Sequence, residues 1–245
     1  MSHNIELKEG AFIVSDAHYS HLRPELLQLM QDIESKKLRP TQLILMGDIF
    51  DALFGDVERT HTINELMLAS INAISQSIEV IYLEGNHDFN LAKLFPHAKV
   101  FSFKMQPVIA TYGSKKVALA HGDFDGTLSY QIYTALIRSR IVMWILKSFD
   151  SLFNHVILNK LDSYLGKKDD CKEFRDFREF IQRRHLEKYE CDYFVEGHFH
   201  QNRSFTFEKF HYINLAAFAC NQRCFIVESL KDKELLKEKI FSKEI

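Results

Sequence analysis

The segment that decides the fold covers residues 42–51 and reads QLILMGDIFD. Its apolar first half is typical of a buried strand, and the Gly-Asp pair that follows indicates where that strand ends. The same arrangement recurs in Ala11–Ser15, Ile78–Leu83 and Lys116–Ala120, where a short apolar run is again followed by polar residues. The first half of the chain therefore predicts four buried strands.

Helical patterns separate the first three of these strands. Apolar residues recur with the spacing of one helix face between Leu22 and Ile33. Thr62 followed by Glu65 predicts a capping box at the start of a second helix. An alternation of strands and helices predicts a largely parallel sheet covered by helices. In such sheets, ligands bind beyond the carboxyl ends of the strands.

The second half of the chain has a different pattern. Residues 127–189 contain no proline and one glycine, Gly166, and we expect them to be mostly helical. Strand-like runs then return at Tyr193–Glu196, Ser204–Phe207, His211–Leu215 and Cys224–Val227. We therefore predict a single domain over residues 1–245, with a helical insertion at about residues 127–189 between two sheet-forming parts.

The composition restricts the environment and the partners of the protein. Among 245 residues, 31 Lys and Arg nearly balance 33 Asp and Glu, and the net charge of −2 argues against a nucleic-acid partner. The chain does not begin with a basic segment followed by a long apolar one, so we expect a cytoplasmic protein. We expect the few cysteines to be reduced thiols, namely Cys171, Cys191, Cys220 and Cys224.

Residues with metal-binding side chains follow the predicted strands. They are Asp16 and His18, Asp48 and Asp51, Asn86 and His87, His121, and, after the strand at Tyr193, His198 and His200. Since side chains alternate along an extended chain, Asp16 and His18 should face the same way, as should His198 and His200. Glycine precedes three of the residues and should let the backbone turn sharply. One such fragment alone is usually a turn or a structural histidine, whereas five in this order indicate a site.

These side-chain types predict a site for divalent metal ions. Carboxylate, amide and imidazole groups together suit Mn²⁺, Fe²⁺, Zn²⁺ or Co²⁺. The groups are too many for one ion, and they suit two ions that share a bridging carboxylate. Two ions about 3.5–4 Å apart can hold the oxygens of a phosphoryl group during in-line displacement. The pattern therefore predicts metal-dependent hydrolysis of a phosphoester. A non-catalytic interaction scaffold, the alternative, would be expected to lack some of these groups.

The series Asp-x-His, Gly-Asp-x-x-Asp, Gly-Asn-His-Asp, His-Gly-Asp and Gly-His-x-His resembles the calcineurin-like metallophosphoesterase superfamily. The resemblance implies an α/β (α+β) fold, namely a four-layer αββα sandwich of two mixed sheets with a binuclear metal centre. It implies that one ion is held by Asp16, His18 and His200, and the other by Asn86, His121 and His198, with Asp48 bridging the two.

The same resemblance implies that His87 is an acid beside the metals, oriented by Asp51. This pairing is chemically reasonable, because a carboxylate fixes the tautomer of an imidazole and raises its basicity. An alternative for Asp51 is an acid at a helix N-terminus that interacts with the helix dipole. We expect Asp88 and Asp123 to hold the loops and the ligands in place.

A narrower resemblance links Gly47–Asp56, Gly85–Phe89 and the insertion that opens at Tyr130 to the UDP-2,3-diacylglucosamine pyrophosphatases of lipid A synthesis. It implies two Mn²⁺ ions and hydrolysis of UDP-2,3-diacylglucosamine to UMP and 2,3-diacylglucosamine 1-phosphate. It also implies a lid over the acyl chains and a peripheral location on the cytoplasmic face of the inner membrane. The best-known branch has Glu in place of Asp51 and Arg in place of His87. The alternative is a soluble calcineurin-like phosphodiesterase or phosphatase that acts on nucleotides or other phosphoesters.

The insertion is both basic and apolar. Between Thr127 and Lys168, six Lys or Arg stand against two acids, which gives this piece a charge of +4. Basic helices with a large apolar surface often lie on anionic membranes or cover lipid chains. The alternative is that the apolar residues pack on the sheet. Candidates for substrate contact are Tyr130, Arg138 and Arg140. A second set of basic residues is interleaved with acids and consists of Arg175, Arg178, Arg183 and Arg184. This spacing predicts an exposed helix with weak ion pairs, and we assign it no function.

Overall fold

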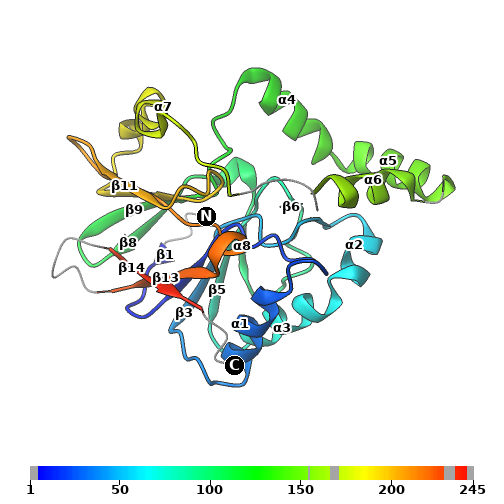
Figure 1. Cartoon of the computed structure of the whole chain (residues 1–245), viewed down its shortest axis with the longest axis horizontal. Coiled ribbons are helices and arrows are strands. Elements are labelled where there is room, and N and C mark those ends of the chain that lie inside the picture. Colours follow the sequence, from blue (N-terminus) through cyan, green and yellow to red (C-terminus); the bar gives the residue numbers. More distant parts are fainter. Residues whose placement is uncertain (1–4, 154, 166–170, 229–234, 242–245) are drawn as a thin grey trace.

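A computed structural model describes residues 5–153, 155–165, 171–228 and 235–241. Most of its strands form two six-stranded sheets (Figure 1). The first has the order β1-β8-β9-β10-β12-β11, with bounds Ile5–Glu6, Val108–Tyr112, Lys115–Ala120, Tyr193–Glu196, His211–Asn214 and Arg203–Thr206. The second has the order β14-β13-β2-β3-β5-β7, with bounds Leu236–Ile240, Arg223–Val227, Phe12–Val14, Gln42–Leu45, Glu79–Leu83 and Lys99–Phe101. The short strands β4 (Leu53–Phe54) and β6 (Asp88–Phe89) pair in parallel with each other.

The helices fall into groups that follow the chain. In the first half they are α1 (Glu25–Glu34), α2 (Glu58–Ile63) and α3 (Glu65–Ser75), with the 3₁₀ turn η1 at Phe103–Met105. The insertion contains α4 (Leu128–Ile137), α5 (Arg140–Leu152), α6 (Val156–Leu165), α7 (Phe177–Arg183) and the 3₁₀ turn η2 at Leu186–Tyr189. The helix α8 (Phe218–Asn221) joins β12 to β13.

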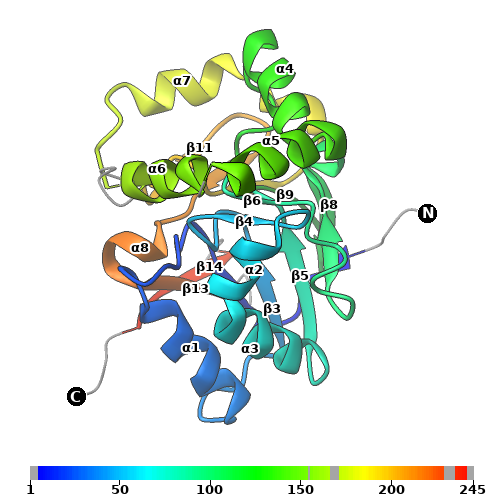
Figure 2. The same ribbon diagram turned by 90° about the vertical axis from the view of Figure 1, so that its right-hand side faces the viewer.

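The helices and sheets stack in four layers. Along β3, Leu43 and Leu45 pack with the helices α1 and α3, whereas Ile44 between them packs into the core between the two sheets. On the outer face of the first sheet, Phe194 of β10 packs in one cluster with Phe177 of α7. Figure 2 shows α1 and α3 on one side of the sheets and α7 on the other. The predicted αββα sandwich is therefore confirmed.

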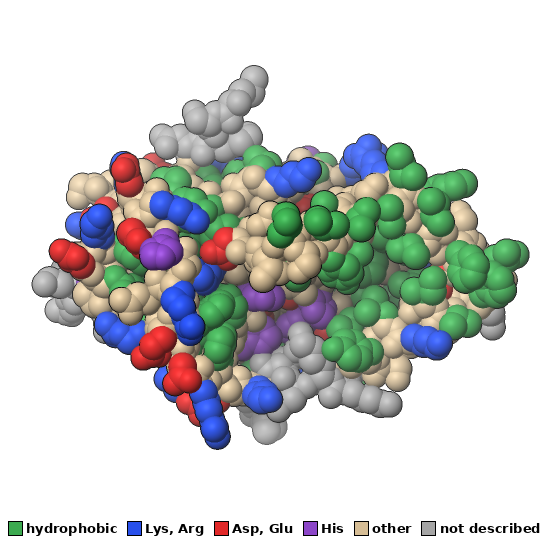
Figure 3. All heavy atoms as spheres, turned by 90° about the horizontal axis from the view of Figure 1, so that it is seen from above, with side chains coloured by type: hydrophobic (Ala, Val, Ile, Leu, Met, Phe, Trp, Pro, Cys, Tyr) green, Lys and Arg blue, Asp and Glu red, His purple; other side chains and the backbone are tan. Residues whose placement is uncertain are grey.

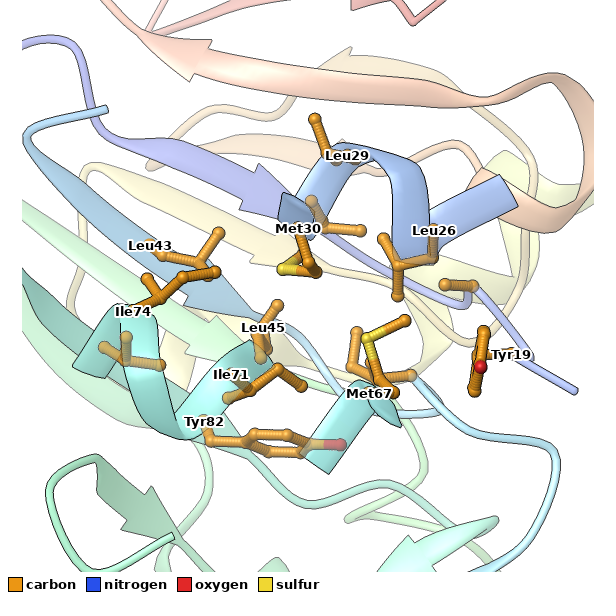
Figure 4. Packing of buried hydrophobic residues seen from close by; sticks show 14 of the residues in the cluster. Tyr19, Leu26, Leu29, Met30, Leu43, Leu45, Met67, Ile71, Ile74 and Tyr82 are labelled. Carbon is orange, nitrogen blue, oxygen red and sulfur yellow. The ribbon is translucent and has the colours of Figure 1, made fainter. Parts of the chain in front are cut away.

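A cluster of apolar side chains between the second sheet and the helices α1 and α3 holds these helices against the sheet. Leu29 and Met30 of α1 and Met67 and Ile71 of α3 are fully buried against this sheet (Figure 4). Complete burial of one such side chain contributes roughly 1.5–3 kcal/mol. The layer is therefore a rigid base for the strand ends that carry half of the predicted site.

The predicted parallel sheet is confirmed, because β2, β3 and β5 pair in parallel, with Ile13 opposite Ile44 and Ile44 opposite Ile81. The predicted capping box is wrong. Thr62 lies inside α2, and α3 begins after Asn64, whose side-chain amide donates to main-chain carbonyls upstream of it. The reason is that α2 and α3 follow each other almost directly, so no extended N-cap residue separates them.

The insertion leaves much of its apolar surface uncovered. Ile141, Trp144 and Leu152 of α5 are 73%, 68% and 78% exposed. The alternative that the apolar residues pack on the sheet is therefore wrong for these three, whereas Met143 is buried with Val57 and Phe89. Within the described residues, no single helix is both long and apolar enough to cross a membrane. The helices α5 and α6 reach that length only together, and the chain bends by 96° between them.

The expectation of four reduced thiols is wrong for one pair of cysteines. Cys171, between α6 and α7 of the insertion, is joined to Cys220 of α8 by a disulfide, with their Cα atoms 5.7 Å apart. The two are separated by 49 positions in the sequence, so their spacing gave no local signal. Cys191 and Cys224 are free and buried. The disulfide ties the insertion to the helix that follows β12.

Candidate metal centre

The carboxyl ends of the central strands of both sheets meet at one face of the molecule. Beyond β2 and β3, the main-chain amide of Asp16 donates to Gly47 O at 3.1 Å. Beyond β9 and β10, Gly197 N donates to His121 O at 2.8 Å. The main-chain amide of His198 donates to the Asp16 carboxylate at 2.9 Å, which joins the two sheets. Figure 3 shows histidine side chains in a hollow at the middle of this face.

One group of possible metal ligands consists of Asp16, His18 and His200, whose ligand atoms all lie within 4.8 Å of one another. His200 Nε2 is 3.1 Å from Asp16 Oδ1. Burial by itself raises the pKa of Asp16, but the attraction of His200, its hydrogen bond and the attraction of His121 together outweigh burial and bring that pKa to about 2. The carboxylate is therefore charged at neutral pH, which is the form that binds cations.

His18 gives the clearest indication that this group suits a metal ion. Both of its ring nitrogens are buried, and neither has a hydrogen-bond partner. The Asp51 carboxylate lies beside the ring, with Oδ1 3.3 Å from His18 Nδ1. Leaving a buried polar atom without a partner costs about 1–3 kcal/mol. A cation between His18 and Asp16 would give one of these nitrogens a partner, so the donors fit an ion.

A second group consists of Asp48, His121 and His198, again with their ligand atoms within 4.8 Å of one another. Asn86 Oδ1 lies 3.3 Å from His121 Nε2, and Asp48 Oδ2 lies 3.4 Å from the same nitrogen. His121 Nδ1 is 3.0 Å from the carbonyl oxygen of Met46. A proton on Nδ1 would donate to that carbonyl and would leave the Nε2 lone pair for an ion.

The charges in the second group are also suitable for a cation. Burial raises the pKa of Asp48, but the attraction of His121 and His87 outweighs it and holds that pKa well below its ordinary value. Burial, with His121 beside it, lowers the pKa of His198 to about 4. At neutral pH Asp48 is therefore a charged carboxylate and His198 a neutral imidazole, and both are forms that ligate divalent metals. Despite burial, in contrast, Asp48 raises the pKa of His121, which must release its Nε2 proton to bind an ion.

The structure brings His87 and Asp51 together, but not through the expected carboxylate. His87 Nδ1 is 2.9 Å from the main-chain oxygen of Asp51. The Asp51 carboxylate lies instead beside His18 and, at 3.8 Å, beside Arg23 Nη1. His87 is thus oriented by a backbone carbonyl, with its Nε2 3.9 Å from Asp48 Oδ2. His18, Asp51 and His87 form a third group with ligand atoms within 4.8 Å of one another.

The local backbone differs from the extended geometry expected at Asp16, His18, His198 and His200. All four have positive φ, of 51°, 45°, 61° and 59°. Left-handed residues of this kind are uncommon and tend to occur at functional sites. Alternation along a strand therefore does not explain why the side chains converge. The turns beyond the strand ends bring them together.

Three comparisons relate this geometry to known proteins. The model of the calcineurin-like phosphoesterase family matches residues 11–202. The chain belongs to this family. A Histophilus somni protein named UDP-2,3-diacylglucosamine hydrolase is 25% identical over 198 residues, which cover 78% of this chain and 83% of that protein. A Pseudomonas putida protein of the same name is 28% identical over 155 residues, covering 62% and 64%. An archaeal phosphodiesterase structure aligns with a TM-score of 0.47 at 13% identity, covering 94% of this chain and 98% of that chain.

This calcineurin-like phosphoesterase is a metal-dependent hydrolase. Its possible ligands are supported by a buried carboxylate, Asp88, which accepts hydrogen bonds from the main-chain amides of Asp48 and Gly85 at 3.0 and 2.9 Å. Tyr82 also donates its hydroxyl to Asp88 at 2.6 Å. Burial and the nearby charge of Asp48 raise the pKa of Asp88 to about 7. Asp88 therefore holds two loops of the site without facing the hollow.

The insertion residues expected to contact substrate have different positions. Tyr130 donates its hydroxyl to Asp123 at 3.0 Å, and Arg138 donates to the carbonyl oxygen of Gly85 at 2.8 Å. Arg140 is exposed at the start of α5. Arg184, predicted to lie on an exposed face, is instead buried with Asp125 and with Glu196. The prediction failed because these two acids are 59 and 12 positions away in the sequence.

An apolar cavity of about 350 Å³ opens between the metal centre and the insertion. Asp51, Asn86 and His87 lie at its metal side. Its other walls come from β4, β6 and three helices of the insertion, and they include Phe54, Phe89, Ile137, Met143, Leu146, Ile157, Leu158 and Leu161. No local pattern in the sequence predicted this cavity, because its walls come from segments far apart in the chain. The fold thus places an apolar chamber directly beside charged metal-binding groups.

Proposed function

We propose that this phosphoesterase cleaves the pyrophosphate of UDP-2,3-diacylglucosamine to UMP and 2,3-diacylglucosamine 1-phosphate. The observation that carries the proposal is the apolar cavity that adjoins Asn86 and His87. A substrate with fatty acyl chains close to a pyrophosphate needs apolar space within reach of the metal centre. The names of the relatives from Histophilus somni and Pseudomonas putida point to the same substrate.

In this proposal, the protein holds two divalent ions, for which we expect Mn²⁺. Asp16, His18 and His200 would hold one, Asn86, His121 and His198 the other, and Asp48 would bridge them. When bound, two such ions supply an activated hydroxide and neutralise charge on the phosphoryl oxygens. The grouping of these side chains, the partnerless nitrogens of His18 and the lone pair left on His121 Nε2 support the assignment.

His87 acts as the acid beside the reacting phosphate. Its Nδ1 faces the Asp51 carbonyl, so a proton on Nδ1 is held there and Nε2 is left to face the site. The protonated ring donates from Nε2 to an oxygen of the phosphate that leaves. The main-chain amide of His87 also donates to Asp48 at 2.8 Å, which keeps the ring close to the bridging carboxylate. The Asp51 carboxylate, next to His18 and Arg23, also lies in one group of possible ligands with His87.

The insertion covers the acyl chains and lies on the cytoplasmic face of the inner membrane. Its outer surface carries Trp144, Ile145 and Leu152, all more than half exposed. Figure 3 shows hydrophobic side chains gathered at the end of the molecule where Figure 1 places α5 and α6. Exposed Arg140 and Lys147 on α5 add positive charge to this surface, which favours anionic lipid headgroups. An acylated substrate would thus pass from the membrane into the cavity.

Substrate comparison tests the proposal. The purified protein is supplied with Mn²⁺ and detergent and is given UDP-2,3-diacylglucosamine, UDP-N-acetylglucosamine or an aryl phosphodiester. We expect UMP from the acylated substrate and little hydrolysis of the other two. Equal turnover of all three would still support phosphoesterase activity, but it would show that the acylated substrate is not preferred. A His87→Ala sample serves as the control for contaminating hydrolases.

A further inference from the structure

Two largely buried arginine side chains of the insertion, 11% and 7% exposed, donate to main-chain carbonyls beside proposed metal ligands. Arg138, which follows α4, donates from Nη2 to Gly85 O at 2.8 Å, and Gly85 directly precedes Asn86. Arg184, which follows α7, donates from Nη2 to Gly122 O at 3.3 Å, and Gly122 directly follows His121.

Arg184 also joins the segments that follow β9 and end β10. Its guanidinium donates to Asp125 at 2.8 and 2.9 Å and to Glu196 Oε2 at 3.1 Å. Glu196 lies two residues before His198 and also accepts a hydrogen bond from the Tyr212 hydroxyl at 2.6 Å. The Arg184 side chain is only 7% exposed. Buried charges are retained in this way only where each one is paired and hydrogen-bonded.

Arg138 has a comparable position on the other side of the second group. Its guanidinium carbon lies 4.5 Å from the ring centre of Phe103 and 5.2 Å from that of Phe89. Its Nη2 is 3.6 Å from the carboxylate of Asp123, which lies two residues after His121. The Tyr130 hydroxyl donates to the same carboxylate. Residues at the start and the end of α4 therefore converge on the loop that follows β9.

These contacts are distributed unequally between the two proposed ions. Asn86, His121 and His198 all lie within two residues of a group that Arg138 or Arg184 holds. Within the described residues, neither arginine donates to a group within two residues of Asp16 or His18, and the side chain of Gln201, next to His200, bonds to Lys172 and Phe174 instead. The carbonyl of Asp16 accepts from Ala219 N of α8 at 3.2 Å, and His18 N donates to Asp48 O at 3.0 Å.

We infer that Arg138 and Arg184 are positioning residues that set the affinity for one ion only, the ion at Asn86, His121 and His198. The inference rests on the two-ion assignment of the proposed function. Groups that orient metal ligands typically change affinity by 10–100-fold when they are replaced. Replacing either arginine should therefore lower the binding affinity for the ion at Asn86, His121 and His198. The ion at Asp16, His18 and His200 should keep its affinity.

The test is calorimetric titration of metal-free protein with Mn²⁺. The variants are Arg184→Lys and Arg138→Lys, which retain the positive charge but lose the planar guanidinium group and its several N–H donors. The matched controls are Arg183→Lys and Arg140→Lys, since both arginines are exposed, Arg183 directly precedes Arg184 and Arg140 lies two residues after Arg138. Circular dichroism verifies that each variant is folded at the temperature of the titration. Arg138→Lys tests the inference by itself if Arg184→Lys does not fold. Electron paramagnetic resonance of the Mn²⁺-loaded protein reports whether the two ions are magnetically coupled.

We expect two binding events in the unaltered protein and in both controls. In the arginine variants, one event should weaken by about 10–100-fold while the other stays the same, and the coupled Mn²⁺ signal should disappear at limiting metal. Equal weakening of both events, or no weakening, would overturn the inference while the two-ion site and its hydrolysis remain. A single event in the unaltered protein would overturn the two-ion assignment, and the inference with it.

Discussion

Gly85 lies so close to Asp48 that a Cβ atom on Gly85 would meet Asp48 Oδ1 at 2.2 Å and Asp48 N at 2.5 Å. This glycine is therefore required for space at the proposed bridging carboxylate, and not because the backbone turns there. Gly197 has the same relationship to Asp16, whose Oδ2 would lie 2.4 Å from an added Cβ. In each case the main chain at one strand end fits directly against a carboxylate from another strand end that we propose as a metal ligand.

Gly85→Ala should therefore displace Asp48 and release metal. We expect at least one of the two ions to be lost and turnover to fall by more than tenfold, because the new methyl group and the carboxylate cannot occupy the same space. Metal analysis of the purified variant checks this. Gly113→Ala is the control, since a Cβ there has nothing within 4 Å. Its φ of +56° should cost only about 1–2 kcal/mol of stability. Full metal content in Gly85→Ala would contradict the proposed role of Asp48.

His87→Ala should reduce turnover without emptying the site. General acid catalysis by a positioned histidine contributes about 10²–10⁴-fold, and we expect a loss in that range. Since His87 is not among the proposed ligands, the metal content should stay within error of the unaltered protein. Steady-state kinetics and metal analysis on the same sample separate the two effects. His97→Ala is an exposed control. Loss of both ions in His87→Ala would show that His87 is a ligand, as the third group with His18 and Asp51 would allow.

Leu161→Gln should selectively weaken binding of the acylated substrate. Leu161 lines the apolar cavity, and an amide there would face acyl carbons without a hydrogen-bond partner. We expect KM for UDP-2,3-diacylglucosamine to rise about tenfold, while residual hydrolysis of an aryl phosphodiester stays the same. Leu128→Gln provides a control in the same insertion, because Leu128 is 74% exposed and does not line the cavity. Equal effects on both substrates would mean that the cavity does not receive the acyl chains.

Thiol titration under denaturing conditions should find two reactive cysteines before reduction and four after it. The two are Cys191 and Cys224, and the others form the disulfide between Cys171 and Cys220. A cross-link that spans 49 positions should raise the free energy of unfolding by about 4 kcal/mol through loss of chain entropy in the unfolded state. Urea unfolding with and without reductant measures this difference. Four reactive thiols without reductant would contradict the cross-link.

The strand-end residues could be predicted from the sequence because each signal is local. An apolar run that ends in Gly-Asp or Gly-Asn-His indicates both a buried strand and a loop at its carboxyl end. The resemblance to a known family then gave the order in which these ends meet. The paired cysteines and the apolar cavity left no such signal, because they depend on which distant segments the fold brings together.

Arg184 illustrates why local charge patterns mislead. Its neighbours alternate between acid and base, which is typical of an exposed helix. Its partners are Asp125, just after β9, and Glu196, at the end of β10. Asp51 is a second example, since its pairing with His87 was predicted through the carboxylate but occurs through the main-chain oxygen. Contacts of this kind depend on tertiary geometry and on backbone atoms, which residue types do not reveal.

The most direct test of the account is a crystal structure of the Mn²⁺-loaded protein with anomalous scattering recorded for manganese. Two peaks about 3.5–4 Å apart should appear, one beside Asp16, His18 and His200 and one beside Asn86, His121 and His198. Asp48 should contact both. A single peak, or a peak between His18, Asp51 and His87 in place of one of these two, would contradict the two-ion site proposed for this phosphoesterase.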